Sequence, residues 1–374
     1  MRQGIGHFTF EGRVYNGLDP RALLEAHAER PESALRHVVE RLDGEYAMAL
    51  ERDEKTALAV DPLGLRPMYY TPVGFSTHRL PGGVLVRPWE VVLIGEGEVA
   101  VREGVDFLSW RKEVKEPMKE LHRALEEALQ KRVKGRVGLL FSGGIDSALL
   151  ARLLAEMEKD VTLYSVGLEG SQELELVRSL DMGLELVVKE LREEELEGYA
   201  RKVVEATGMI EAMQVAIGLP VYAACEAAKE DGQEAVLAGQ GADELFGGYH
   251  RYLALSPADL EKALREDVRA LYRTNVPRDA AIADALGLWL SCPYLDRDVV
   301  GVALGIPSAL KIKGGVRKYL LRELGRRLGL PEAVWGRRKR AIQYSTGVES
   351  GLRRLARGKG QGLGDYLASL TNRL

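Results

Sequence analysis

A glycine-rich segment at residues 142–147 is the first part of this chain that could carry chemistry. It reads Ser-Gly-Gly-Ile-Asp-Ser and follows an apolar run at 136–141. Glycines let backbone N–H groups converge on phosphate oxygens without a Cβ in the way, and the N-terminus of a following helix adds positive charge. We therefore predict a loop that binds the pyrophosphate part of ATP. The predicted phosphate ligands are Ser142, Gly143, Gly144 and Ser147.

Asp146 is the carboxylate of this loop. Because two anions repel, we do not expect it to touch phosphate; it is better suited to hold Mg²⁺ against the triphosphate. The loop is not a Walker A motif, since it lacks the Gly-Lys-Ser/Thr ending. A plain strand-to-helix turn is the alternative, and the apolar run before the loop and a helix expected from near Ala148 favour phosphate binding.

A second glycine-rich segment, GQGADELFGGY at 239–249, also follows an apolar run and is expected to open a helix. Asp243 can supply a second carboxylate to Mg²⁺, which otherwise keeps mostly waters and phosphate oxygens. Gly239 and Gly241 permit close approach to ATP. The alternative is a left-handed turn that carries a solvated Asp-Glu pair.

Basic residues in the last part of the chain could stabilise the charge that grows as pyrophosphate leaves. Lys318 and Arg322 share one short segment, and Lys339 lies in a basic run at 337–340. Preplaced cations stabilise such a transition state. A basic run alone is more often a solvated face or a nucleic-acid patch, so this assignment depends on the two glycine-rich segments.

The surrounding residues predict alternating helices and strands. A helix is expected at 115–131, where apolar residues recur every three or four positions. Apolar runs typical of buried parallel strands stand at 136–141, 161–166, 184–188 and 235–238. We predict an α/β fold with a doubly wound parallel sheet, whose ligands bind at the carboxyl ends of the strands. The last third, from about Ser256, is expected to be mainly helical.

Residues 1–105 have a different character, with short β-like runs punctuated by Pro and Gly. A helix is expected from Pro20 to Leu42, with Asp19 as its N-cap. Strands, the first two forming a hairpin, are expected at 45–50, 56–60, 84–86 and 91–94. We therefore predict a small α+β domain at 1–105 and an α/β domain at 106–374.

Composition narrows the class of protein. The 374 residues carry 52 basic and 56 acidic side chains, a net charge of −4, which argues against a general nucleic-acid binder. Cys225 and Cys292 have no metal-like spacing and are expected to be buried thiols. No apolar run approaches the ~20 residues of a transmembrane helix, and residues 1–4 lack the layout of a signal peptide. We predict a cytoplasmic protein with no membrane or nucleic-acid partner.

Six motifs, taken together and in this order, resemble asparagine synthetases of the class B type and the related β-lactam synthetase. They are SGGIDS (142–147), SVGLEGS (165–171), GQGADELFGGY (239–249), PYLD (293–296), KYLLRE (318–323) and RRKRAIQYSTG (337–347). The first also resembles the signature of ATP-pyrophosphatases, which cleave between the α and β phosphates. The resemblance extends from near residue 110 to near residue 350.

The resemblance implies roles for individual residues. Leu140 and Val166 would line the adenine pocket, and Asp146 and Asp243 would be the metal carboxylates. Lys339 matches the lysine that steadies the adenylate and pyrophosphate. The residues expected to act in catalysis are Lys339, Gln240, Lys318 and Arg322, and Gly239 and Gln240 are expected to contact the nucleotide.

Residues 42–47 and 61–70 resemble the class II glutaminase domain of the same enzymes. That domain is Ntn-hydrolase-like and uses an N-terminal cysteine as nucleophile. Here position 2 is Arg, no Cys precedes Cys225, and the domain is much shorter than usual. We expect a truncated remnant that makes no ammonia and serves a structural or interface role, with a homodimer as one option.

Two departures concern the substrate. The family often has Glu where Gln240 stands, and a neutral amide cannot act as a general base. The family usually shows GxExRxP before its PYLD motif, whereas residues 287–293 read Gly-Leu-Trp-Leu-Ser-Cys-Pro. If the missing Glu and Arg help to read an amino-acid substrate, aspartate becomes uncertain.

Three hypotheses stay open. The first is an ATP-dependent ligase that adenylates aspartate and transfers ammonia to it, with the ammonia either dissolved or supplied by a separate glutaminase subunit. The second keeps the adenylation chemistry but changes the acid or uses an intramolecular amine. The third is a nucleotide-binding scaffold without turnover.

Overall fold

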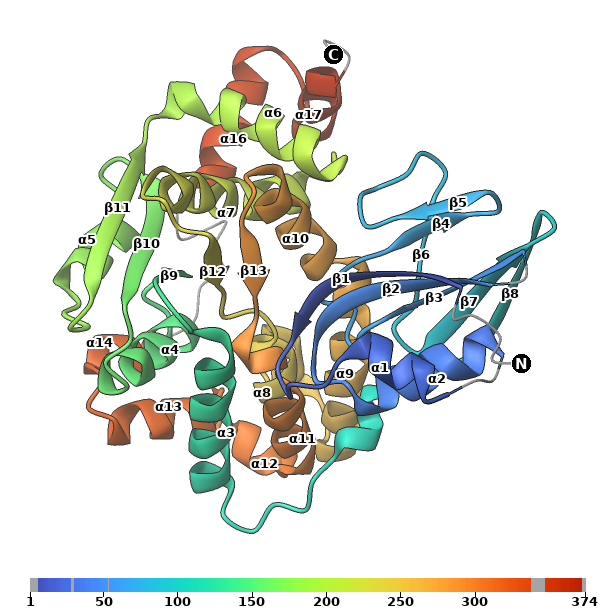
Figure 1. The fold of residues 1–374 in the computed structure, drawn as a ribbon. Helices are drawn as coiled ribbons and strands as arrows, with labels where there is room; N and C mark the ends of the chain where they lie inside the picture. The colour runs from blue at the N-terminus through green and yellow to red at the C-terminus, as the bar shows by residue number, and fades with distance from the viewer. Residues whose placement is uncertain (1–5, 28–29, 53, 338–346, 372–374) are drawn as a thin grey trace.

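The computed structural model describes residues 6–27, 30–52, 54–337 and 347–371. Two parts lie side by side in it. An antiparallel, β-rich part extends to Glu103, and a parallel α/β part follows it (Figure 1). This change of architecture falls where the sequence predicts a domain boundary, although the boundary itself stays a prediction.

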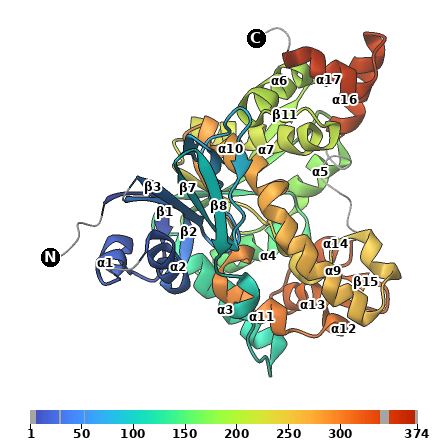
Figure 2. The ribbon, with the colours of Figure 1, turned by 90° about the vertical axis from the view of Figure 1, so that its right-hand side faces the viewer.

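The β-rich part is built on a five-stranded antiparallel sheet in the order β1-β2-β3-β7-β8. The strands are β1 (His7–Val14), β2 (Gly44–Arg52), β3 (Lys55–Val60), β7 (Glu90–Gly95) and β8 (Glu98–Glu103). Two short helices, α1 (Pro20–Glu25) and α2 (Pro31–Arg41), cover one face (Figures 1 and 2). A small sheet of β4 (Tyr69–Thr71), β5 (Gly74–Ser76) and β6 (Val84–Leu85) packs over the other. Strand alternation explains this layering: Met48 packs with the helices, and its neighbour Ala49 with the small sheet.

The single helix expected from Pro20 to Leu42 is wrong. The chain forms α1 (Pro20–Glu25) and α2 (Pro31–Arg41) instead. Pro31 causes the break, because proline lacks an N–H and suits the first turn of a helix rather than its interior. The expected cap is confirmed, since the Asp19 carboxylate accepts a hydrogen bond from the N–H of Arg21.

The α/β part contains a five-stranded parallel sheet in the order β11-β10-β9-β12-β13. The strands are β9 (Val137–Leu140), β10 (Val161–Leu168), β11 (Glu185–Leu191), β12 (Ala235–Leu237) and β13 (Trp289–Ser291). One face packs with α3 (Pro117–Arg132), α4 (Ile145–Glu156) and α5 (Gln172–Ser179), and the other with α6 (Leu196–Thr207), α7 (Ala212–Glu230) and α10 (Asn275–Ala285). Helices on both faces confirm the doubly wound α/β sheet.

The last third is mainly helical, as expected. The elements described there are α9 (Pro257–Ala270), η4 (Leu271–Arg273), η5 (Pro293–Leu295), α11 (Arg297–Gly305), α12 (Ser308–Lys311), β14 (Ile312–Lys313), β15 (Val316–Arg317), α13 (Tyr319–Arg327), α14 (Glu332–Trp335), α16 (Val348–Gly358) and α17 (Leu363–Thr371). Four short elements lie before them in the chain: η1 (Phe107–Trp110), η2 (Glu193–Glu195), α8 (Ala242–Phe246) and η3 (His250–Ala254). Figure 2 shows α16 and α17 beside α6.

The structure also bears on the two cysteines and on the expectation that the chain has no transmembrane helix. Cys225 and Cys292 are buried thiols, as predicted. Among the described residues, no single helix is both long and apolar enough to cross a membrane. The pair Glu193–Thr207 and Ala212–Glu230 meets that test only together, with a bend of 102° between them. Most of its apolar side chains belong to the core on one face of the sheet, although Met213 is exposed.

Candidate active site

The two glycine-rich segments meet at the centre of the parallel sheet. β9 and β12 are neighbours, and the order of the strands reverses between them. The loop after each strand therefore opens at the topological switch point, where ligands of doubly wound sheets bind. The loops touch: a Cβ on Gly239 would lie 3.2 Å from the Cβ of Asp146. The sheet thus brings together two segments that are far apart in sequence.

The first loop turns directly into α4. The helix begins at Ile145, so the expectation of a start near Ala148 is wrong by three residues. Gly143, at φ +66°, adopts a left-handed conformation that favours glycine. Because the helix begins early, Asp146 and Ser147 sit in its first turn, where the helix end carries partial positive charge.

The hydroxyls of Ser142 and Ser147 face each other across this loop. Their Oγ atoms are 3.2 Å apart, and the N–H of Ser142 donates to the Ser147 Oγ at 3.1 Å. Ser142 is exposed, whereas Ser147 is buried. The loop is therefore held in shape by its own hydroxyls, with the Ser142 side chain at the surface that a phosphate would approach.

The second loop is shaped by two glycines with little space around them. Gly241 has φ +91°, and a Cβ there would lie 2.4 Å from the Leu295 side chain. A Cβ on Gly248 would lie 1.6 Å from the Asp243 carboxylate. Between them stands the short helix α8, so the prediction that this segment opens a helix is confirmed. Only glycine at 248 leaves the carboxylate of Asp243 in its observed place.

Lys318 joins the two loops. Its Nζ lies 2.5 Å from the Asp146 carboxylate and 2.7 Å from the Asp243 carboxylate. The lysine is 1% exposed, whereas each carboxylate is 21% exposed. We call these three residues the Lys318 cluster. It unites residues from all three segments singled out by sequence.

The backbone and charge of Lys318 are both unusual. Its φ of 55° and ψ of 37° are left-handed, a conformation that costs energy for a residue with a side chain. Burial lowers its pKa, but the carboxylates of Asp146 and Asp243 outweigh burial and raise the pKa above its usual value. The two carboxylates therefore favour the charged form of the Lys318 amine.

The cluster fits a magnesium site in its donor chemistry. Mg²⁺ is commonly bound through one or two protein carboxylates, with phosphate oxygens and waters completing the octahedron. Asp146 and Asp243 already converge on one cation. Within the described residues, the Oδ1 of Asp146 is buried without a hydrogen-bond partner. An orphaned carboxylate oxygen at a partly open position has the chemistry that such a cation would satisfy.

The other two predicted cations have different fates. Arg322 is 9% exposed, and its guanidinium donates to the carbonyls of Arg317 and Trp335. Burial lowers its pKa. Arg322 thus holds backbone near the cluster rather than facing open space. Lys339 lies outside the described residues, so its role stays a prediction.

The predicted nucleotide contacts lie around the same edge of the sheet. Leu140 ends β9, and Val166 lies on the adjacent strand β10, two residues beyond the register partner of Leu140. Gln240 follows Gly239 in the second loop, and its buried Nε2 has no hydrogen-bond partner among the described residues. All three are placed where they could meet a nucleotide, and their roles stay predictions.

Two residues near the loops were not assigned a role from sequence. Tyr294 is fully buried, and its hydroxyl donates to the Asp146 carbonyl at 3.0 Å. Glu244 is 3% exposed and accepts from the Tyr249 hydroxyl; burial, and then the adjacent Asp243, raise its pKa to about 7. Tyr294 belongs to the PYLD motif, so a signal was present, but its target could not be read from it.

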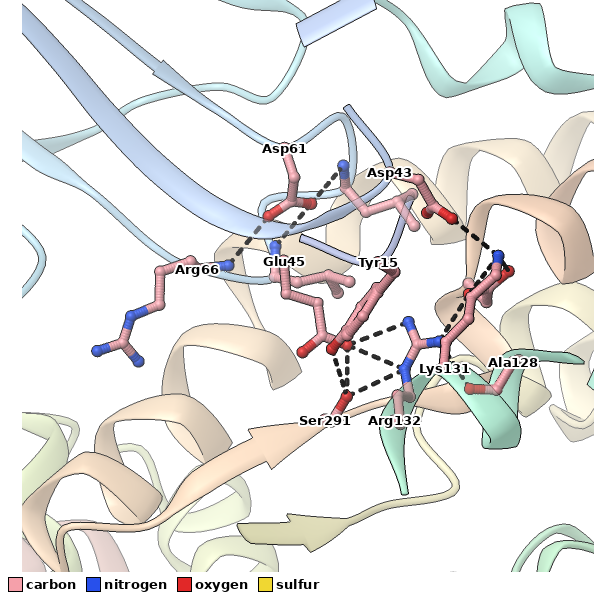
Figure 3. Close-up of polar contacts among 12 residues, drawn as sticks. Tyr15, Asp43, Glu45, Asp61, Arg66, Ala128, Lys131, Arg132 and Ser291 are labelled. Atoms are coloured by element: carbon pink, nitrogen blue, oxygen red, sulfur yellow. Dashed lines mark hydrogen bonds and ion pairs between the residues drawn. The ribbon is translucent and has the colours of Figure 1, made fainter. Parts of the chain in front are cut away.

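The departure at residues 287–293 has a structural counterpart at the interface with the β-rich part (Figure 3). Glu45 of β2 accepts from the Ser291 Oγ at 2.6 Å and from the Trp289 Nε1 at 3.0 Å. Arg132, the last residue of α3, donates from Nε to Ser291 at 3.0 Å and from NH1 to Asp296 at 2.6 Å. We call Glu45, Arg132, Ser291 and Asp296 the Arg132 clamp. Trp289 and Ser291 thus bond to the β-rich part.

Comparison with known proteins matches this chain to a family description named asparagine synthase, over residues 120–262 and 254–363. The chain belongs to the asparagine synthase family. The predicted resemblance to asparagine synthetases, and with it the expectation of a ligase of this type, is confirmed at the level of the family.

Individual members of the asparagine synthase family differ in how much of their length the chain spans. A protein of Methanocaldococcus jannaschii, described as a candidate glutamine-hydrolysing asparagine synthetase, is 32% identical over 92% of this chain and 79% of its own length. Asparagine synthetase B of Escherichia coli is 26% identical over 89% of this chain, which spans only 65% of that enzyme. Among solved structures, NMN synthetase from Francisella tularensis shares 14% identity over 69% of this chain and 92% of its own, with a TM-score of 0.32.

Proposed function

We propose that this protein is an ATP-dependent carbon–nitrogen ligase that adenylates a carboxylic acid and transfers an amine to it. The carboxylate attacks the α-phosphate of ATP, pyrophosphate leaves, and the amine displaces AMP from the acyl-adenylate. The observation that carries this proposal is the convergence of Asp146 and Asp243 on one cation at the switch point of the sheet. Membership of the asparagine synthase family supports it.

Each part of the site has a place in this reaction. The backbone of 142–144 and the Ser142 hydroxyl would bind pyrophosphate, and Leu140 with Val166 would bind adenine. Asp146 and Asp243 would hold Mg²⁺, which neutralises phosphate charge when bound. Lys318 would then release one or both carboxylates and offer its ammonium to the leaving pyrophosphate, a role that we assign to Lys339 as well.

Aspartate is the acid we propose first, because the named relatives are asparagine synthetases. A second acid is favoured by one observation: Trp289 and Ser291 stand where the family usually has Glu and Arg, and both bond to Glu45 instead. Their polar atoms are therefore engaged with protein. An acid read by other residues, or an intramolecular amine, fits this arrangement.

We further propose that the β-rich part supplies no ammonia, since no cysteine precedes Cys225 in this chain. Ammonia would then come from solution or from a separate glutaminase subunit. A cytoplasmic location and a homodimer are the accompanying proposals. A nucleotide-binding scaffold without turnover is the competing function.

The test is release of pyrophosphate from ATP and Mg²⁺ by the purified protein. One arm contains aspartate and ammonium chloride, a second aspartate and glutamine, a third ammonium chloride alone, and further arms other amino acids. Release only with aspartate and ammonium would support an ammonia-dependent asparagine synthetase. Release of pyrophosphate with another acid would identify that acid as the substrate in place of aspartate. Binding of ATP without release of pyrophosphate with any acid would favour the scaffold function.

A further inference from the structure

The short helix η5 touches both glycine-rich loops. Tyr294 donates to the carbonyl of Asp146 in the first loop. Leu295 fills the space beside Gly241 in the second, where a Cβ would come within 2.4 Å of it. Both side chains are buried, at 0% and 1% exposure. A shift of η5 would therefore move the backbone carbonyl of Asp146 and the turn at Gly241 that precedes Asp243.

The Arg132 clamp fixes η5 at both ends. Ser291 lies two residues before η5 and bonds to Glu45 and Arg132. Asp296 follows η5, bonds to Arg132, and caps α11 through the N–H of Asp298 at 3.0 Å. A guanidinium fork is rigid and planar, so one Arg132 side chain sets the distance between the two ends.

The clamp is closed to solvent and internally satisfied. The side chains of Glu45 and Arg132 are each 2% exposed, and that of Asp296 is 0% exposed. Arg132 also lies over the ring of Tyr15, with its Cζ 4.5 Å from the ring centroid. Figure 3 shows Glu45 and Tyr15 of the β-rich part converging with Arg132 of α3 and Ser291 of β13. No substrate can reach these groups without opening the interface, so their effect on the site must be indirect.

We propose that Glu45 is a positioning residue for the two nucleotide loops, acting through Ser291 and η5 on Tyr294 and Leu295. The β-rich part then has a role other than supplying ammonia. Its strand β2 provides the Glu45 carboxylate, which holds η5 in place against the two glycine-rich loops. This inference rests on the proposed nucleotide role of the loops.

Hydrogen–deuterium exchange of the full chain without ligand tests this proposal. Glu45→Gln keeps the shape but puts an amide donor against groups that donate to Glu45. We expect exchange in 142–148 and 241–246 to rise roughly three- to tenfold, the effect of losing about one hydrogen bond. Tyr294→Phe should do the same at 142–148. Glu98→Gln, on the exposed strand β8 of the same sheet, is the matched control and should leave both loops unchanged.

The double variant separates positioning from general loosening. If Glu45 acts through η5, Glu45→Gln and Tyr294→Phe together should raise exchange at 142–148 no more than the stronger single variant. Additive effects there, no change in the loops, or a uniform rise across the parallel sheet would overturn the proposal. A rise confined to the loops with non-additivity supports it.

Titration with Mg-ATP gives a second readout that separates the two proposals. Both single variants should weaken binding roughly three- to tenfold, and the control should not. If the unsubstituted protein binds no Mg-ATP, the proposed function fails, while hydrogen exchange still decides whether Glu45 holds the loops.

Discussion

The Lys318 cluster and the Arg132 clamp each place a cation between two carboxylates. They differ in how open they are, and in the clamp Asp296 also pairs with a second cation, Lys131. In the cluster each carboxylate is 21% exposed and one oxygen of Asp146 has no partner among the described residues. In the clamp the carboxylates are 2% and 0% exposed. We propose that the first arrangement can exchange its cation for another, whereas the second is a fixed joint.

The choice of cation agrees with that difference. Lysine carries a compact charge on a flexible stem, which suits a cation that the proposed Mg²⁺ would displace. Arginine binds two carboxylates through a rigid fork, which suits a permanent joint. Of two similar buried ion clusters, we therefore assign chemistry to the one that uses lysine and architecture to the one that uses arginine.

The largest expected effect is on turnover at the open cluster. Asp146→Asn or Asp243→Asn removes a carboxylate that we propose to hold the metal. It should lower pyrophosphate release at least about 100-fold, as loss of a key electrostatic group typically does. Asp181→Asn, an exposed aspartate, is the control for handling and should retain turnover. Retained activity in both cluster variants would remove the basis for treating the cluster as a metal site.

The next effect is on stability at the closed clamp. Arg132→Met leaves Glu45 buried without Arg132, and leaves Asp296 paired with Lys131 alone. It should lower the free energy of unfolding by about 3–5 kcal/mol. Urea denaturation followed by circular dichroism measures it. Arg123→Met, on the exposed face of α3, should change stability by less than about 0.5 kcal/mol. A loss at 132 no greater than at 123 would show that the clamp is not a structural joint.

Lys318→Met sharpens the comparison, because it removes the cation from the open cluster. The partly exposed carboxylates can be hydrated, so the loss of stability should be smaller, about 2–3 kcal/mol. Mg²⁺ alone should now bind and restore about 2 kcal/mol at concentrations well above its Kd. Thermal unfolding with and without MgCl₂ measures both, with Lys134→Met as the exposed control. An unfolding temperature that ignores Mg²⁺ would argue that the carboxylates do not form a cation site.

The smallest effect is a pH dependence at the edge of the clamp. Burial raises the pKa of Asp298, but hydrogen bonds from Lys112 and Lys131 outweigh it and lower the pKa to about 2. Because the folded pKa is depressed, this stabilisation is present above the ordinary aspartate pKa and is lost as pH falls toward 2. Asp298→Asn should thus be less stable than the unsubstituted protein at pH 7, with the gap closing between about pH 4 and pH 2. A gap that does not change with pH would contradict the assignment.

The sequence predicts the α/β part well where the signal is local. Apolar runs locate β9 to β12, and glycine spacing locates both loops. It fails where a long-range partner decides. β13 has only three residues and is defined by pairing with β12. Pro31 divides a helix whose apolar spacing is otherwise continuous.

The residues of the candidate site could be chosen from the sequence, but the geometry that brings them together could not. Asp146, Asp243 and Lys318 were each singled out by type and motif, yet Lys318 is 172 residues from Asp146, and no local pattern reports that they touch. Tyr294 and Glu45, which we propose as positioning residues, were missed for a related reason. Their effect comes from what they contact in the folded protein, whereas their residue types suit an ordinary core tyrosine and an ordinary strand glutamate.

The contacts between the two parts also bear on how the chain comes apart on heating. Asp43 binds Lys131, Arg66 binds Asp284 at 2.7 Å, and Arg79 donates to the carbonyl of Gly208 at 2.6 Å, so the parts are tied at several places besides the clamp. We expect parts joined this way to melt together, because unfolding of either one removes these contacts from the other. The boundary near residue 105 is then a boundary of architecture and not of cooperativity: calorimetry should record one transition, and a fragment beginning at 106 should be less stable than the same residues in the whole chain.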